Sequence, residues 1–257
     1  MNTKRFKNAI VRKPCKNMVK GLTTAKLGKP NFELACEQHQ NYIEALKICG
    51  LKVEILESDE DYPDSTFIED VALLTPHCAI ITIPGAPSRK GEMDGVIKTI
   101  EKYYNNIDFI QEPATIEPGD IMMVDDHYYI GLSARTNQEG ARQMMEILKK
   151  YNMGATTVEL QKVLHLKTGL AYLEHNNLIA AGEFVSASCF QQFNILEIES
   201  NESYAANCIW VNDKVIVPKG YPNAKRIIEN SDYQTLEVDV SEFKKLDGGL
   251  SCLSLRF

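Results

Sequence analysis

Short apolar segments occur in pairs along this chain, and a short polar turn separates the two members of each pair. Segments of this length, bounded by Asn, Asp and Pro, are typical of strands joined by a chain reversal. Their recurrence predicts an array of similar units. Four pairs are evident: Val71–Leu74 with Ala79–Ile83, Ile121–Val124 with Tyr128–Leu132, Leu170–Leu173 with Leu178–Ala181, and Cys208–Val211 with Val215–Val217.

The two ends of the chain supply a fifth unit. Asn8–Arg12 and Ser251–Leu255 are both strand-like, and they can pair only if the structure closes on itself. Closure removes the open edge that a radial array of sheets would otherwise have. We therefore expect an α/β protein with five strand-pair units around a centre.

Helical segments follow the strand pairs. Apolar residues recur at helical spacing in Phe32–Cys49, Val96–Tyr103 and Gln138–Tyr151, and Lys52–Ile55 adds a further strand. No linker or low-complexity segment interrupts the chain, which predicts a single domain over residues 1–257. The expected apolar stripes are Leu34, Ala35, Tyr42 and Leu46 in the first helix and Ala141, Met144, Met145 and Leu148 in the third.

Charge and composition argue against several classes of function. The chain has 28 Lys and Arg against 35 Asp and Glu, a net charge of −7, and no basic cluster, so nucleic acid is an unexpected partner. No apolar run approaches the ~20 residues that span a bilayer, and the basic start lacks an apolar signal region, so we expect a cytoplasmic protein. The seven cysteines show no C-x-x-C spacing, which predicts free thiols.

Cys252 and His165 are the candidate reactive residues. Cys252 follows a Gly-Gly turn and is expected to begin the terminal strand; for a cysteine in isolation, a buried structural role is the commoner one. His165 precedes a strand pair and is expected within a strand at the sheet, where a thiolate would require an acid and base. The other histidines are expected to be solvated: His39, His77, His127 and His175.

Two acidic segments, Asp64–Asp70 and Glu117–Asp120, precede predicted strands. Carboxylates at such positions are usually caps or exposed turn residues. Their recurrence in two repeats would bring them to one centre if the repeats are radial, and carboxylates around one Cys and one His require a cationic substrate. Arg89 and Arg135 follow the outer strands of two repeats and could bind a carboxylate through their planar guanidinium groups, although each would also fit an ordinary surface position.

Together these segments resemble the bacterial dimethylarginine dimethylaminohydrolases, within the guanidine-modifying amidinotransferase/arginine deiminase superfamily. The resemblance covers essentially the whole chain and implies a five-bladed, pseudo-symmetric α/β propeller of the pentein type, in agreement with the five repeats. Seven ordered stretches carry it: Lys20–Thr24, Asp64–Asp70, Pro84–Arg89, Glu117–Val124, Ser133–Asn137, Leu164–Gly169 and Asp247–Leu255.

The resemblance also implies residue roles. Cys252 would be the nucleophile, His165 the general acid and base, and Glu117 the carboxylate that orients His165 and touches the guanidinium. Asp70, with Glu69 beside it, would bind the guanidinium, and Asp64 and the carbonyl of Leu246 would bind the α-ammonium. Arg89 and Arg135 would bind the α-carboxylate. Leu22 and Phe67 would close over the substrate from a mobile segment near the N-terminus.

The implied reaction is hydrolysis of Nω-methylated arginines to citrulline and dimethylamine or methylamine, through a covalent S-alkylthiouronium on Cys252. Nearby carboxylates predict a resting thiol that ionises when the cationic substrate binds. No cofactor or resident metal is implied; His165, Cys252 and Glu117 could capture zinc, which would inhibit the reaction.

Three other functions are weighed against this one. An arginine deiminase shares the core chemistry, but its relatives usually carry a helical insertion for which this chain has no segment. An amidinotransferase differs only in the nucleophile that resolves the thiouronium, and the sequence does not exclude it. A non-catalytic methylarginine-binding protein would have no need of Cys252. The preferred methylarginine and the formation of a homodimer stay open.

Overall fold

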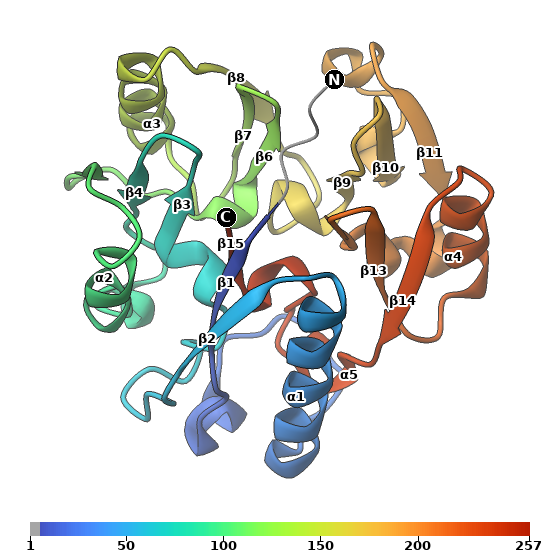
Figure 1. Ribbon diagram of the computed structural model, residues 1–257, viewed down its shortest axis with the longest axis horizontal. Coiled ribbons are helices and arrows are strands. Elements are labelled where there is room, and N and C mark those ends of the chain that lie inside the picture. Colours follow the sequence, from blue (N-terminus) through green and yellow to red (C-terminus); the bar gives the residue numbers. More distant parts are fainter. Residues whose placement is uncertain (1–5) are drawn as a thin grey trace.

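The computed structural model describes residues 6–257, and within that range the chain forms five three-stranded sheets. In every sheet an antiparallel strand pair is extended by a third strand, which runs parallel to the middle strand. Figure 1 shows the five sheets arranged around a common centre. The chain is thus an α/β protein built from five similar units, as its repeats predict.

Four sheets follow one another along the chain, and the fifth joins its two ends. In that fifth sheet Ala9 lies opposite Arg256 and Ile10 opposite Leu255, which confirms the predicted pairing of the termini. The strands, in sheet order, are β15 (Leu255–Arg256), β1 (Asn8–Arg12) and β2 (Lys52–Leu56); β3 (Ala72–Leu74), β4 (Ala79–Ile81) and β5 (Ile107–Phe109); β6 (Ile121–Val124), β7 (His127–Leu132) and β8 (Gly154–Glu159); β9 (Leu170–Tyr172), β10 (Asn177–Ala181) and β11 (Asn194–Ile198); β12 (Ile209–Val211), β13 (Lys214–Pro218) and β14 (Gln234–Val238).

Helices connect the middle strand of a sheet to its third strand in four units, whereas β10 and β11 are joined by short 3-10 turns. Asn31 and Asn137 begin α1 and α3 by accepting hydrogen bonds from the N–H groups of Leu34 and Gly140, at 2.9 and 2.7 Å. The three predicted helices are confirmed. The helices are α1 (Phe32–Ile48), α2 (Asp94–Ile100), α3 (Gln138–Lys150), α4 (Pro222–Glu229) and α5 (Ser241–Lys244).

Two predictions of side-chain burial on α1 are wrong. Leu34 is 38% exposed, and His39, expected to be solvated, is only 2% exposed. Ala35, His39, Tyr42 and Leu46 follow the i, i+4, i+7 spacing of one helix face, so the true buried stripe includes the histidine. On α3, Met145 is likewise partly exposed, at 36%, while its predicted companions are buried.

The apolar core is divided into five clusters, and each cluster contains residues of two sheets. They join the sheet of β1 to those of β3 and β12, the sheet of β6 to those of β3 and β9, and the sheet of β9 to that of β12. The first strands of the sheets face one another, since β15 contacts β3 and β9 contacts both β6 and β12. No helix between residues 6 and 257 is long and apolar enough to cross a bilayer.

A short 3-10 turn precedes the first strand of each sheet, and these five strands, β3, β6, β9, β12 and β15, are called the inner strands below. The turns contact one another in succession, so they gather at one end of the molecule. This ring of turns, called the turn ring below, is where residues from all five repeats meet. Its members are Ile68–Val71, Pro118–Asp120, Leu166–Thr168, Ser200–Ala206 and Ser251–Leu253.

Candidate active site

Four of the five repeats place predicted reactive or charged residues at the turn ring. Asp70 and Cys252 lie within turns, and Glu117 and His165 immediately precede turns. The predictions that Cys252 begins a strand and that His165 lies within one are therefore wrong. The backbone N–H of Cys252 donates to the carbonyl of Gly249 at 3.2 Å, which winds the segment into a turn before β15 begins.

A cavity of about 210 Å³ opens at the turn ring. Thr23, Thr24, Leu164, Asp247 and Gly248 complete its wall. Ten of the eleven predicted site residues line it: Leu22, Asp64, Phe67, Asp70, Arg89, Glu117, Arg135, His165, Leu246 and Cys252.

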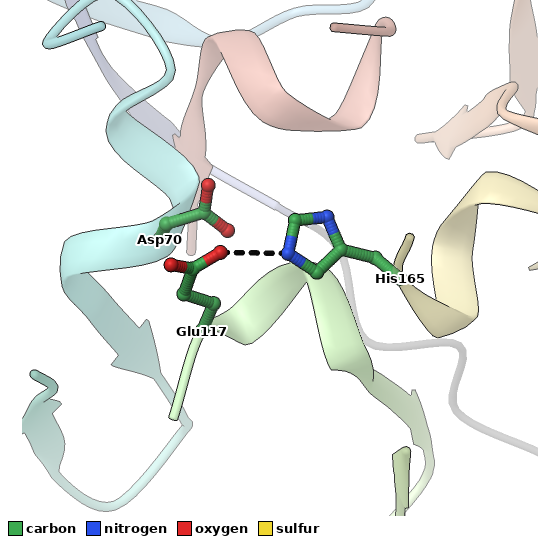
Figure 2. Close-up of side chains that lie close together, drawn as sticks. All are labelled: Asp70, Glu117 and His165. Carbon is green, nitrogen blue, oxygen red and sulfur yellow. Dashed lines mark hydrogen bonds and ion pairs between the residues drawn. The ribbon is translucent and has the colours of Figure 1, made fainter. Parts of the chain in front are cut away.

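Asp70, Glu117 and His165 form a compact group on one wall of the cavity (Figure 2). His165 Nε2 lies 2.7 Å from Glu117 Oε2, and one ligand atom from each of the three side chains falls within 4.8 Å of the others. Figure 2 shows Nε2 turned toward the carboxylates and Nδ1 turned away from them. The group could hold a small cation, but its two carboxylates are equally suited to a planar guanidinium.

The environment of His165 favours its protonated form. Burial alone would lower its pKa, but the hydrogen bond to Glu117 and the charges of Asp70 and Asp120 outweigh burial and raise the pKa to about 9. The environment of Cys252 favours its neutral form, because burial and the charges of Glu69 and Asp70 raise the pKa of its thiol to about 12. The free protein therefore holds an imidazolium and an un-ionised thiol in the wall of one cavity.

Asp120, a fully buried carboxylate, ties three segments of the site together. Its Oδ2 accepts hydrogen bonds from the hydroxyls of Ser133 and Thr136, both at 2.6 Å, and its Oδ1 accepts from the N–H of Leu166 at 2.9 Å. These contacts fix the loop that carries Arg135 and the turn that follows His165. Sequence reasoning included Asp120 in an acidic segment but gave it no role.

The two predicted carboxylate-binding arginines differ in their surroundings. The Arg135 side chain is 22% exposed, and its Nη1 lies 3.5 Å from Glu117 Oε1. Arg89 is buried, and its fork is already occupied: Nε and Nη2 bind the carboxylate of Glu92 at 3.0 and 2.8 Å, and Nη1 binds Asp70 Oδ2 at 2.6 Å. Arg135 is therefore the more available of the two for a ligand.

Gly85 permits the close packing behind this part of the site. A Cβ at position 85 would lie 2.5 Å from the carbonyl oxygen of Arg135, which no side chain tolerates. The N–H of Gly85 also donates to Glu117 Oε1 at 2.9 Å. The glycine thus brings its own loop, the Arg135 loop and Glu117 together.

Glu69 is placed differently from the prediction. It does not line the cavity at Cys252; instead its Oε1 pairs with Lys167 Nζ at 2.5 Å and its Oε2 accepts from the Ser251 hydroxyl at 2.9 Å. Asp70 alone of the two neighbouring carboxylates faces this cavity. The difference arises because successive residues of a 3-10 turn point about 120° apart.

Asn207, at the end of the turn that precedes β12, holds the Cys252 turn in place. Its Oδ1 accepts from the N–H of Ser251 at 3.0 Å, and its Nδ2 donates to the Ser251 hydroxyl and to the carbonyl of Lys167 at 3.0 and 2.9 Å. Sequence reasoning missed Asn207. A usable signal existed, because Asn207 is a polar residue just ahead of an apolar strand, as Asp70 is ahead of β3.

The segment at Leu22 lies over the cavity and is held at both sides. The N–H of Leu22 donates to Asp64 at 3.0 Å, and the N–H and hydroxyl of Thr24 donate to Asp247 at 2.5 and 3.0 Å. Leu22 is 39% exposed, whereas Phe67 is 5% exposed and packs edge-on against Phe243. Phe67 therefore belongs to the fixed wall and not to the covering segment.

The chain was compared with known proteins. A family model described as N,N dimethylarginine dimethylhydrolase, eukaryotic, matches residues 16–253. The N(G),N(G)-dimethylarginine dimethylaminohydrolase of Pseudomonas aeruginosa is 56% identical over 253 residues, which cover 98% of this chain and 100% of the relative.

Solved structures agree with these matches. The P. aeruginosa enzyme, as a cysteine-to-serine mutant with citrulline, superposes with a TM-score of 0.98 at 56% identity, covering 99% of this chain and 100% of that one. The N-terminal domain of ArgZ, a cyanobacterial arginine dihydrolase, has a TM-score of 0.88 at 17% identity over 98% of this chain and 97% of its own, which supports the fold alone. The chain belongs to the dimethylarginine dimethylaminohydrolase family.

Proposed function

We propose that this protein hydrolyses Nω-methylated arginines, namely asymmetric dimethylarginine and monomethylarginine, to citrulline and dimethylamine or methylamine. The observation that carries the proposal is a cavity in which Cys252 and His165 meet the buried carboxylates of Asp70 and Glu117. The name of the P. aeruginosa relative, and the citrulline in its structure, support the same substrate class.

Binding would use opposite charges at the two ends of the substrate. Asp70 and Glu117 would hold the guanidinium, whose charge they match. Arg135, with the one N–H of Arg89 Nη1 that Asp70 leaves free, would bind the α-carboxylate. The α-ammonium would lie against Asp64 and the backbone carbonyl of Leu246, and Leu22 and Phe67 would flank the aliphatic chain.

The chemistry follows from the protonation states. The charge of a bound guanidinium would stabilise the Cys252 thiolate, so the thiol proton is released to water as substrate binds. The thiolate attacks the central carbon, which requires an approach of about 3–3.5 Å. His165, protonated at rest, donates a proton from Nδ1 to the departing amine, which could not leave as an anion.

The second half of the reaction reverses the role of His165. The remaining S-alkylthiouronium is attacked by water, and the now neutral imidazole accepts the water proton. Collapse of the adduct forms the carbonyl of citrulline and breaks the C–S bond, and the proton lost from the hydroxyl of the adduct reprotonates the departing thiolate. Glu117 would keep the ring oriented through both steps.

We also propose that residues 1–257 form one domain, a closed five-bladed α/β propeller. This is supported by the five core clusters, which join the sheets in an unbroken cycle. The paired termini in the sheet of β1 support it as well. Limited proteolysis should then leave the chain intact up to its global unfolding transition.

The function is tested by incubating the purified protein separately with asymmetric dimethylarginine, monomethylarginine and arginine, and measuring citrulline and the released amine. Citrulline from the methylated substrates, lost in Cys252→Ser, is the expected result. Citrulline formed mainly from arginine would reassign the protein to the deiminases. No citrulline from any of the three would contradict the proposal.

Ionisation of Cys252 is tested by ultraviolet difference titration of its thiolate, with Cys252→Ser subtracted. The free protein should show little thiolate across neutral pH, because the thiol pKa is raised to about 12. A saturating guanidine that is not turned over should move the titration to lower pH. A thiolate already present at neutral pH in the free protein would contradict ionisation by the substrate.

A further inference from the structure

Three buried charged residues alternate in sign behind the guanidinium position. Glu92, Arg89 and Asp70 are 2%, 4% and 2% exposed. Arg89 binds the Glu92 carboxylate with one edge of its guanidinium and Asp70 with Nη1. Glu92 itself does not line the cavity, and the proposed reaction gives it no part.

The contacts of Asp70 show that its orientation is set before any substrate binds. Its Oδ2 accepts from Arg89 Nη1 at 2.6 Å, and its Oδ1 accepts from the N–H of Gly119 at 3.1 Å. The Arg89 plane is set in turn by the bidentate contact with Glu92 and by a hydrogen bond from Nη2 to the carbonyl of Phe67 at 3.0 Å. Such a bidentate pair fixes geometry as well as charge.

The charge balance explains why Glu92 is needed. Asp70 paired with Arg89 alone would be a neutral unit, with little attraction for a second guanidinium. Glu92 shares the Arg89 charge, so these three residues by themselves carry one net negative charge when Glu92 is ionised. Two other cations interact with them: Arg12 with Glu92, and protonated His165 with Asp70, although His165 is itself paired with Glu117. A substrate guanidinium at Asp70 would then complete the alternation, with its positive charge balanced in a buried site where electrostatic interactions are weakly screened.

We propose that Glu92 is a positioning residue that enables Asp70 to select a cationic guanidinium over a neutral ureido group. The inference deepens the proposed function and rests on it for the identity of the ligand. It predicts that Glu92 matters for substrate binding and much less for citrulline, which carries the same amino-acid end but no cationic head.

The test measures the Kd values of L-arginine and of L-citrulline by calorimetry in the Cys252→Ser background, where neither is turned over. The pH is kept above 7, because burial raises the pKa of Glu92 to about 7 against the opposing charge of Arg89. Glu92→Gln, which keeps the side-chain shape, should weaken arginine binding by about 10-fold more than it weakens citrulline binding, because any loss through the Arg89 contact with the α-carboxylate is common to both ligands.

A double-mutant cycle with Asp70→Asn identifies the route of the effect. If Glu92 acts through Asp70, Glu92→Gln should add little to the loss that Asp70→Asn causes alone. Glu112→Gln is the matched control, because Glu112 is an exposed carboxylate paired with Lys90 at 2.7 Å and lies outside the cavity. Its two Kd values should equal those of the parent.

A purely structural role would give a different pattern. Equal weakening of arginine and citrulline, or fully additive losses in the cycle, would overturn the proposal. If Glu92→Gln does not fold, Glu92→Asp replaces it; this variant keeps the charge but is one methylene too short to reach both nitrogens of Arg89, so a smaller loss with the same selectivity for arginine is expected, and equal weakening of both ligands would again overturn the proposal.

The binding test is separable from the test of function. Absence of methylarginine hydrolysis in the unmodified protein would contradict the proposed function, yet the comparison of arginine with citrulline would still be measurable. Equal affinity of the parent for the two ligands would overturn the inference about Glu92 whatever the catalytic result.

Discussion

Glu69 and Asp70 are consecutive residues of one turn, yet they face different cavities. Asp70 lines the cavity that contains Cys252, whereas Glu69 lines a second cavity of about 150 Å³ between the inner strands. The second cavity has a largely apolar wall, which includes Leu73, Met122 and Trp210. One turn therefore places a carboxylate in each of two cavities.

The carboxylates on the two sides are stabilised in different ways. Glu69 is satisfied within the protein by Lys167 and Ser251, with Arg256 Nη2 3.8 Å away. Asp70 shares its arginine with Glu92, so the group keeps a net negative charge. Ion pairing thus satisfies the carboxylate on one side of the turn ring, while incomplete charge compensation leaves the other side ready for a cationic ligand.

The strongest test of this comparison removes each charge separately. Asp70→Asn should lower kcat/KM for dimethylarginine by about 100-fold or more, because it removes a buried charge aimed at the guanidinium. Glu69→Gln should lower it far less but reduce the free energy of unfolding by about 2–3 kcal/mol, since Lys167 loses a buried partner. Steady-state kinetics and urea denaturation measure the two effects. A larger catalytic loss in Glu69→Gln than in Asp70→Asn would contradict the assignment of Asp70, and not Glu69, to the guanidinium.

Asn207 contacts both the turn that carries Cys252 and the backbone of Lys167, so its replacement should lower both activity and stability by a moderate amount. Asn207→Ala removes three hydrogen bonds around Ser251 and Lys167, and we expect about a 10-fold lower kcat and about 1–3 kcal/mol lower stability. Asn207→Asp keeps the acceptor for the Ser251 N–H, so its kcat and stability should lie between those of the parent and those of Asn207→Ala. An unchanged kcat in Asn207→Ala would show that the Cys252 turn is held by its other contacts.

The smallest effect on catalysis is expected at His39, which lies outside both cavities. Burial lowers its pKa to about 4 from 6.5, so the unfolded chain binds the proton more strongly. The contribution of neutral His39 is complete above pH 6.5 and is lost as the pH falls toward 4, by roughly 3 kcal/mol in all.

Denaturation at several pH values checks this expectation. In His39→Leu the free energy of unfolding should fall less steeply as the pH is lowered from 6.5 toward 4, and kcat at neutral pH should not change. His77→Leu, in the turn between β3 and β4, is the control and should keep the pH dependence of the parent. A pH dependence that is identical in His39→Leu and the parent would assign the loss of stability to other groups.

Much of the architecture could be predicted from local sequence patterns. Paired apolar segments and helical spacing were sufficient for the four strand pairs and three helices, because strand and helix periodicity are local properties. The pairing of Asn8–Arg12 with the C-terminal strand followed from the requirement to close an open edge. The turns around Cys252 and His165 could not be predicted this way, since apolar residues continue on both sides of them.

Sequence patterns alone predicted the repeat and the residue types ahead of each inner strand, and ten of the eleven site residues inferred from the ordered motifs line the cavity. Only the tertiary structure decided that Asp70 and not Glu69 faces that cavity, that Arg89 is shared with Glu92, and that His39 is buried. The physical reason is that a side chain's direction within a short turn, and the partners of a buried charge, depend on contacts between segments far apart in the chain.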